Sequence, residues 1–123
     1  MDKPHKRLDA WKLSMELVLD IYRLTAEFRA EERYGLVAQM RAAAVSVPSN
    51  IAEGAARNTK REFANFLHVA QASLSELDTQ VDIAVRLGYL TPGAATSALD
   101  RMERIDKMLT GLIKSLRRGG VNA

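Results

Sequence analysis

The chain has 123 residues, of which 47% are hydrophobic and 27% are charged, and its formal net charge at pH 7 is +3. This composition is typical of one globular domain that buries its own core, and it excludes an intrinsically disordered chain. The absence of cysteine excludes disulfides and cysteine-based zinc sites, so packing alone must hold the fold together.

The charged segment from Met1 to Arg7 leads into no apolar region of the kind that a secretory signal needs. No later stretch approaches the roughly 18 uninterrupted apolar residues that a membrane-spanning helix requires. We therefore expect a cytoplasmic protein with no membrane partner.

Apolar residues recur at helical spacing in four segments, and no segment alternates as a β-strand does. Local signals mark the ends of these segments. Thr59 with Glu62 forms a capping-box pattern, Gly88 is a helix terminator, and Thr91 with Pro92 gives an N-cap and a first-turn proline. Because the connections are short, consecutive helices should run antiparallel. The sequence therefore predicts a single-domain, all-α, up-and-down four-helix bundle with helices at about 8–28, 31–56, 60–87 and 92–118.

The first predicted helix carries two apolar stripes about 140° apart around its axis. One stripe contains Leu8, Trp11, Met15, Val18 and Tyr22, and the other contains Leu13, Leu17, Ile21, Leu24 and Phe28. A helix with two apolar sides needs two surfaces to pack against, whereas a lone bundle supplies one. We predict that the second stripe forms a subunit interface in a homo-oligomer. The alternative is a helix buried deep within its own bundle.

The second predicted helix contains an internal proline, Pro48, which removes a backbone hydrogen bond and should kink the axis. Hydrogen-bonding residues line one face beside its apolar stripe, and we interpret them as a structural polar network of Gln39, Ser46, Asn50 and Glu53. The alternative role for Glu53 is that of an acid or base. No nucleophile or second titrating group accompanies it, which favours the structural role.

Motifs that carry catalysis are absent from the sequence. It contains no P-loop, glycine-rich nucleotide turn or nucleophile elbow. No glutamate is followed by a histidine three residues later, as di-iron bundles require, so we expect no metal and no cofactor. His68, beside the core face of the third helix, fits a partly buried structural histidine better than a ligand. The sequence therefore predicts that the chain is not an enzyme.

Positive charge is concentrated late in the chain, and two basic features stand out. Arg57, Lys60 and Arg61 lie at the start of the third helix, where free backbone N–H groups add positive potential. The second feature is a stripe on the outer face of the fourth helix, formed by Arg104, Lys107, Lys114 and Arg118. Each could be an ordinary solvated surface, but together they allow contacts with the phosphates of nucleic acid.

Several segments resemble one protein family. They are Glu32 to Leu36, Gln39 to Arg41, Ser46 to Gly54, Glu62-Phe63, Phe66-Leu67, Glu76-Leu77 and Leu87 to Leu90, with the opening Leu8 to Lys12. The family is the four-helix-bundle proteins encoded in intervening sequences of bacterial 23S ribosomal RNA genes, to which the accessory proteins of diversity-generating retroelements are similar. The resemblance covers roughly residues 8 to 90, and the run from Pro48 to Gly54 is its most specific part.

This resemblance implies a non-catalytic, ring-like homopentamer of four-helix bundles that binds nucleic acid through basic surfaces and docks a protein such as a reverse transcriptase. It adds Arg41 to the candidate contacts and supports Arg57. Members often carry two consecutive basic residues where this chain has Arg41 and Ala42. We therefore expect an oligomeric accessory protein that binds structured RNA or DNA. The alternative is a protein-docking scaffold without a nucleic-acid role.

Overall fold

The structure, a computed structural model, describes the backbone of residues 3–121 and the side chains of residues 3–118. Within these residues the chain is helical and contains no strand. The α-helices are α1 (Asp9–Thr25), α2 (Leu36–Ala55), α3 (Lys60–Arg86) and α4 (Pro92–Val121), and two short 3-10 helices, η1 (Pro4–Arg7) and η2 (Ala30–Glu32), precede α1 and α2.

Three helix ends differ from the sequence-based prediction, and one of them is the end of α4, which continues to Val121 where about 118 was predicted. Helix α1 ends at Thr25, so Phe28 lies in the connection that follows it, and α2 begins at Leu36, five residues later than expected. The reason lies in the connection, where η2 and Gly35 interrupt the helical path, and Gly35 has non-helical torsion angles. The Glu32 carboxylate accepts a hydrogen bond from the Leu36 backbone N–H at 3.4 Å and so supports the first turn of α2.

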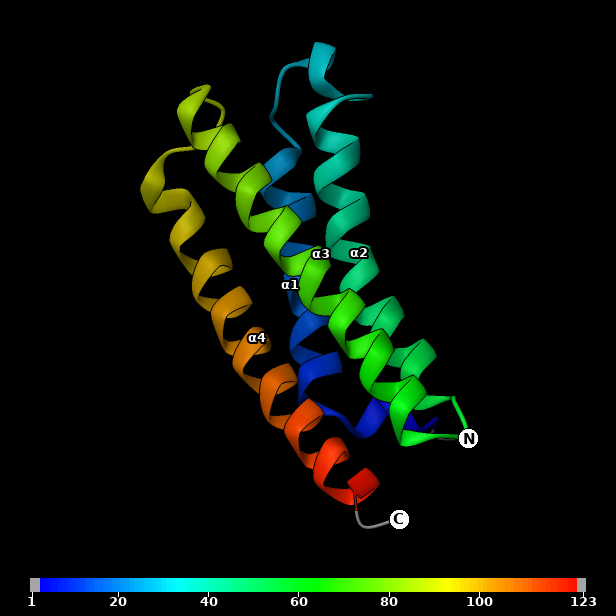
Figure 1. Cartoon of the computed structure of the whole chain (residues 1–123). Coiled ribbons are helices and arrows are strands. Elements are labelled where there is room, and N and C mark those ends of the chain that lie inside the picture. Colours follow the sequence, from blue (N-terminus) through cyan, green and yellow to red (C-terminus); the bar gives the residue numbers. More distant parts are fainter. Residues whose placement is uncertain (1–2, 122–123) are drawn as a thin grey trace.

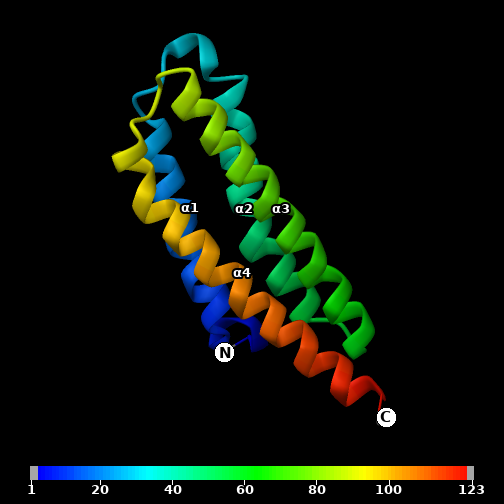
Figure 2. The same ribbon diagram turned by 60° about the vertical axis from the view of Figure 1, so that its left-hand side comes forward.

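Consecutive helices run in opposite directions and pack as a four-helix bundle around one core (Figures 1 and 2). Each helix packs against two neighbours, with the most extensive contact between α2 and α3, and α4 closes the bundle against α1. This up-and-down order brings the start of α1, the α2–α3 connection and the end of α4 to the same end of the bundle. Helix η1 packs there, against α1 and α2.

The core corrects the prediction made for the two stripes of α1. Leu17 and Ile21 are fully buried in the chain's own bundle, and Leu13, Leu24 and Phe28 pack against the same core. These five residues therefore do not form an exposed subunit interface. Two hydroxyl side chains extend the buried side of α1, because Ser14 and Thr25 donate hydrogen bonds to backbone carbonyls of their own helix.

The polar network predicted on α2 is smaller than expected and reaches α3 instead. The Ser46 and Ser73 hydroxyls lie 2.8 Å apart, and the Asn50 amide donates to the Ser46 hydroxyl at 2.9 Å. Gln39 and Glu53 do not take part, since Gln39 is exposed and Glu53 points outward. The reason is orientation: both side chains are exposed to solvent, whereas Ser46 and Asn50 are partly buried against α3.

Candidate nucleic-acid interface

Basic side chains from three separate parts of the sequence meet at one end of the bundle. They come from η1, from the α2–α3 connection with the start of α3, and from the last turns of α4, the elements that the topology gathers at the lower end of Figure 1. The set comprises Lys3, Lys6, Arg7, Arg57, Lys60, Arg61, Lys114, Arg117 and Arg118. We call it the basic end.

Three acidic residues of α1, α2 and α3 share this end of the bundle, namely Asp9, Glu53 and Glu62, and the last two have partners within the chain. The Glu62 backbone N–H donates to the Thr59 hydroxyl at 3.1 Å, as the capping-box pattern predicted, and the Glu62 carboxylate accepts a hydrogen bond from the same hydroxyl at 3.0 Å. Glu53 pairs with Arg57 at 2.7 Å. Lys60, Arg61 and Lys114, by contrast, have no ion-pair partner within the described part of the chain. The first turn of α3 adds the positive potential of its free N–H groups.

Between α3 and α4 the basic end is hollowed into a pocket of about 530 Å³. Its lining residues are Lys60, Arg61, Ala64, Asn65, His68, Leu116 and Arg117. The Arg117 guanidinium lies 3.1 Å from Nε2 of His68. His68 is exposed, so the prediction of a partly buried structural histidine was wrong. It lies at the edge of the contact between α3 and α4, where it lines this pocket.

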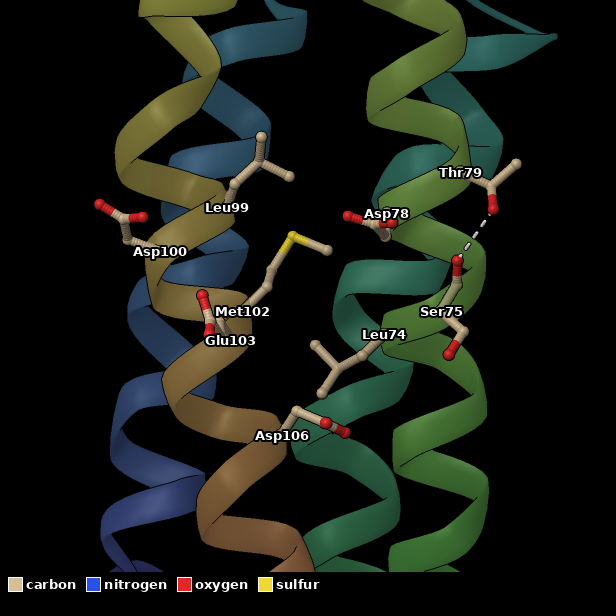
Figure 3. A pocket seen from close by; sticks show the side chains of 9 residues that line it. All are labelled: Leu74, Ser75, Asp78, Thr79, Leu99, Asp100, Met102, Glu103 and Asp106. Carbon is tan, nitrogen blue, oxygen red and sulfur yellow. Dashed lines mark hydrogen bonds between the residues drawn. The ribbon is translucent and has the colours of Figure 1, made fainter.

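Farther along the contact between α3 and α4, which we call the α3–α4 seam, the surface charge changes from positive to negative. A second pocket of about 560 Å³ lies between the middle parts of α3 and α4 (Figure 3). Leu74 and Met102 point toward one another across its floor. Asp78 from α3 and Asp106 from α4 point into the space between the helices, and Glu103 lies on the same side. We call this pocket the acidic groove. Its carboxylates give it a negative potential, opposite in sign to that of the basic end.

The predicted basic stripe of α4 is consequently divided. Lys114 and Arg118 lie in the last turns of the helix and join the basic end. Lys107 instead pairs with Glu103 at 3.3 Å beside the acidic groove. Arg104 lies near Asp100, with which it lines a shallow pocket on the outer side of α4. The stripe was expected to act as one surface, but carboxylates on neighbouring turns separate its two halves.

Arg41 and Arg57, the two candidates supported by the family resemblance, are both engaged within the bundle. Arg41 donates a hydrogen bond to the Thr25 hydroxyl at 2.9 Å, and its guanidinium lies 4.4 Å from the centre of the Tyr22 ring. It therefore ties α2 to α1 far from the basic end. Arg57 lies at the basic end, but it pairs with Glu53 and covers the Phe66 ring at 4.9 Å.

Sequence reasoning missed Arg117 and the basic residues of η1, which are Lys3, Lys6 and Arg7. Helical periodicity places Arg117 toward the α3 side of α4 rather than on the predicted outer stripe. The predicted antiparallel order was the available signal. It already required the chain start, the α2–α3 connection and the end of α4 to share one end of the bundle.

A second surface, on α1 and α2, is apolar although it faces outward. Met15, Leu19 and Tyr22 of α1 are 43%, 50% and 42% exposed, and Val45 of α2 is 40% exposed. Between the two helices lies an apolar pocket of about 350 Å³. The outward side of α2 continues with small uncharged residues, namely Ala38, Ala42 and Ser49. We call this surface the α1–α2 face. Exposed helix faces are normally charged or polar.

The described residues contain no group of three or more His, Cys, Asp or Glu side chains arranged to hold a metal ion. No described helix has the length and apolar character that crossing a membrane would require.

Comparison with known proteins identifies the family. A family model described as 23S rRNA-intervening sequence protein matches residues 6–111. The chain belongs to this family. It matches none of the curated proteins with which it was compared. The resemblance stated from sequence motifs is thus confirmed.

A solved structure shows the same fold. It is a protein of unknown function from the S23 ribosomal protein family of Bacteroides thetaiotaomicron VPI-5482. The two structures superpose with a TM-score of 0.77 at 21% sequence identity, over 85% of this chain and 98% of the other. At this identity the likeness concerns the arrangement of the helices.

The motifs that relate this chain to the family make packing contacts. In the run from Pro48 to Gly54, Asn50 holds the Ser46–Ser73 contact, and Gly54 lies directly against Phe66 of α3. The motif segments near Glu32 and Tyr89 meet at the opposite end of the bundle. There the Tyr89 hydroxyl donates to the Glu32 carboxylate at 2.8 Å, and the Tyr89 ring stacks on Phe28. These contacts of the family motifs therefore hold the bundle together.

Proposed function

We propose that this member of the 23S rRNA-intervening sequence protein family is a non-catalytic, self-associating cytoplasmic protein that binds structured RNA or DNA through its basic end. The observation that supports this proposal is the convergence of basic side chains from η1, α3 and α4 at one end of the bundle, where they outnumber the carboxylates of Asp9, Glu53 and Glu62. The small net charge of +3 conceals this polarity, because the acidic groove offsets the basic end.

Phosphate contacts predict weak sequence preference and a steep dependence on salt. If about five phosphates are neutralised, affinity for duplex DNA should fall roughly 500-fold between 50 and 200 mM salt. Fluorescence anisotropy with a labelled DNA duplex and a labelled RNA hairpin measures this slope. A flat salt response, or no binding at 50 mM salt, would refute the proposal.

Charge-reversal variants locate the contact. Lys60→Glu with Arg61→Glu should weaken binding to every sequence about equally, because the phosphates that they contact are the same in all. The matched control is Arg33→Glu with Arg86→Glu, which makes the same change in net charge at the opposite end of the bundle. If both double variants lose the same affinity, the basic end is not the binding surface and only net charge matters.

Self-association is the second part of the proposal, and the α1–α2 face supports it. Its apolar and small side chains would leave water on contact with another copy, which provides the driving force for assembly. We propose a closed ring of five copies, the number that the resemblance to retroelement accessory proteins implies. Light scattering at micromolar concentration tests it, and a monomeric mass would contradict it.

The acidic groove favours one alternative function, a scaffold that docks a protein partner. Its leucine and methionine floor between carboxylates suits a cationic protein segment with an apolar side chain, such as a basic surface of a reverse transcriptase. This function predicts that charge changes in the groove alter partner binding, while changes at Lys60 and Arg61 do not. Binding assays with both sets of variants therefore separate the two functions.

A further inference from the structure

The pocket at the basic end combines two kinds of wall. Ala64, which is 8% exposed, and the half-buried Leu116 supply an apolar inner surface. Lys60, Arg61 and Arg117 surround it with positive charge. A volume of about 530 Å³ falls in the range of roughly 300–1,000 Å³ that small-molecule sites occupy. A ligand that matches both walls has an anionic group joined to a flat or apolar body.

Two hydrogen-bonding groups in the pocket have capacity to spare. Asn65 makes no side-chain hydrogen bond within the described residues, so its amide can both donate and accept. An arginine side chain can only donate hydrogen bonds. In the contact between Arg117 and His68, the Nε2 atom of His68 therefore accepts, and the Nδ1 atom of the same ring carries the proton. This contact holds the Arg117 guanidinium beside the pocket, where it can donate hydrogen bonds to a phosphate.

The seam limits how far a bound strand can extend. Gln71 donates hydrogen bonds to Asp106 at 3.2 Å and to Thr110 at 2.9 Å, which bridges α3 and α4 between the two pockets. Beyond this bridge lies the acidic groove. A phosphate chain that follows the seam would meet carboxylates there, so the pocket accommodates a short ligand and not a continuous strand.

We propose that this pocket takes one unpaired nucleotide of a bound nucleic acid. Lys60, Arg61 and Arg117 would hold its phosphate, and its base would lie against Ala64 and Leu116 within reach of Asn65. The inference rests on the proposed nucleic-acid function and narrows it, because it predicts a preference for structures with an extruded or overhanging nucleotide over fully paired ones.

Nuclear magnetic resonance with small probes tests the pocket directly. The probes are AMP, adenosine and inorganic phosphate, each titrated into the full-length protein with labelled methyl groups and amides. We expect AMP to shift the methyl resonances of Ala64 and Leu116 together with the amides of Lys60 and Arg61. Phosphate alone should shift only the amides. If AMP and phosphate give the same pattern, the pocket does not receive the base and the inference fails.

A variant that fills the pocket provides the matched test with nucleic acid. Ala64→Leu leaves every cation in place, so binding of blunt duplex should change less than about twofold, whereas binding of a duplex with an unpaired overhang should weaken about tenfold. Because Ala64 is buried, Asn65→Ala serves as a second variant that the exposed site tolerates, with the same selective loss expected. Equal loss for both probes, or none for either, refutes the nucleotide site. If wild-type protein binds neither probe, the proposed function itself fails.

Discussion

Gly54 sets the distance between α2 and α3. A Cβ atom built at this position would lie 2.8 Å from Cβ of Phe66 and 3.1 Å from the backbone oxygen of Phe63. Neither atom is the far end of a flexible side chain, so the helices themselves would have to separate. This contact explains in physical terms why glycine ends the most specific family motif of the chain.

We expect Gly54→Ala to destabilise the bundle by about 1–3 kcal/mol through overpacking, even though alanine favours helix by about 1 kcal/mol. Gly111→Ala in α4 is the control, because a Cβ there meets nothing within 4 Å. That change should stabilise the protein by about 0.5–1 kcal/mol. Urea denaturation measures both. Stabilisation by Gly54→Ala of the same size would show that α2 and α3 do not meet as closely as described.

Tyr89 predicts a change in stability at high pH. The hydrogen bond to Glu32 is the main cause that raises the pKa of Tyr89 above its ordinary value of 10.0, and desolvation and the negative charge of Glu32 add to it. Because the pKa of Tyr89 is higher in the folded state than in the unfolded state, the hydrogen bond to Glu32 contributes its full stabilising free energy below pH 10. It is lost as the pH rises through the folded-state pKa, when the phenolate can no longer donate.

Tyr89→Phe removes the titrating group and keeps the ring that stacks on Phe28. We expect the variant to be less stable than the wild type near neutral pH, with the difference shrinking above pH 10. Urea midpoints at several pH values measure this difference, to which the other tyrosines contribute equally in both proteins. A difference that stays constant with pH would show that the Glu32 contact does not operate.

At the scale of the helix, the buried and exposed sides of α1 predict opposite outcomes for the same kind of substitution. Leu17→Glu with Ile21→Glu places two carboxylates in the core, which should cost several kcal/mol and abolish the helical circular dichroism at 25 °C. Met15→Glu with Leu19→Glu changes the exposed α1–α2 face. It should leave the helical signal intact and reduce the mass found by light scattering to that of a monomer.

Two outcomes would contradict the assignment of one side of α1 to the core and of the other to the α1–α2 face. If the Leu17 and Ile21 variant keeps its helical signal and only dissociates, the core assignment is wrong. A variant at Met15 and Leu19 that keeps the wild-type mass would instead show that assembly does not use the α1–α2 face.

The same helix shows what sequence alone can and cannot predict. Helix caps are local, and Thr59, Gly88 and Thr91 behave as predicted: Thr59 and Thr91 accept hydrogen bonds from backbone N–H groups, and Gly88 has a positive φ of 82°. Periodicity likewise located most apolar positions of α1, although the exposed Leu19 belongs to neither predicted stripe. It could not tell that members of both stripes pack against the core, because that depends on the three other helices and on small buried residues such as Ser14.

The candidate interface was only partly predictable for a related reason. Lys60 and Arg61 are adjacent in sequence and stand out as a cluster. Their combination with Arg117 depends on the register of α3 against α4, which no local pattern contains. The division of the α4 stripe depends on the same register, because Asp78 of α3 and Asp106 of α4 form the acidic groove only once the two helices pack together.

For the whole molecule, the acidic groove should mark the boundary of the nucleic-acid footprint. Glu103→Gln removes one carboxylate and releases Lys107 from its ion pair. We expect tighter binding of duplex DNA and a salt slope steeper by about 1, because one more cation becomes available to a phosphate. Asp82→Asn, which releases Arg86 at the opposite end, is the control and should leave the slope unchanged. An unchanged slope in both variants would place the footprint away from the groove.

Positive charge at one end and carboxylates along the α3–α4 seam give the molecule a permanent electric dipole moment along its length. In the field of a polyanion, such a dipole experiences a torque that turns its positive end forward before any contact is made. The bundle should therefore attach upright, with its helices standing away from the strand. In that orientation the α1–α2 face points sideways, toward a neighbouring copy. Attachment to nucleic acid and assembly with other copies would then use perpendicular surfaces and proceed without competition.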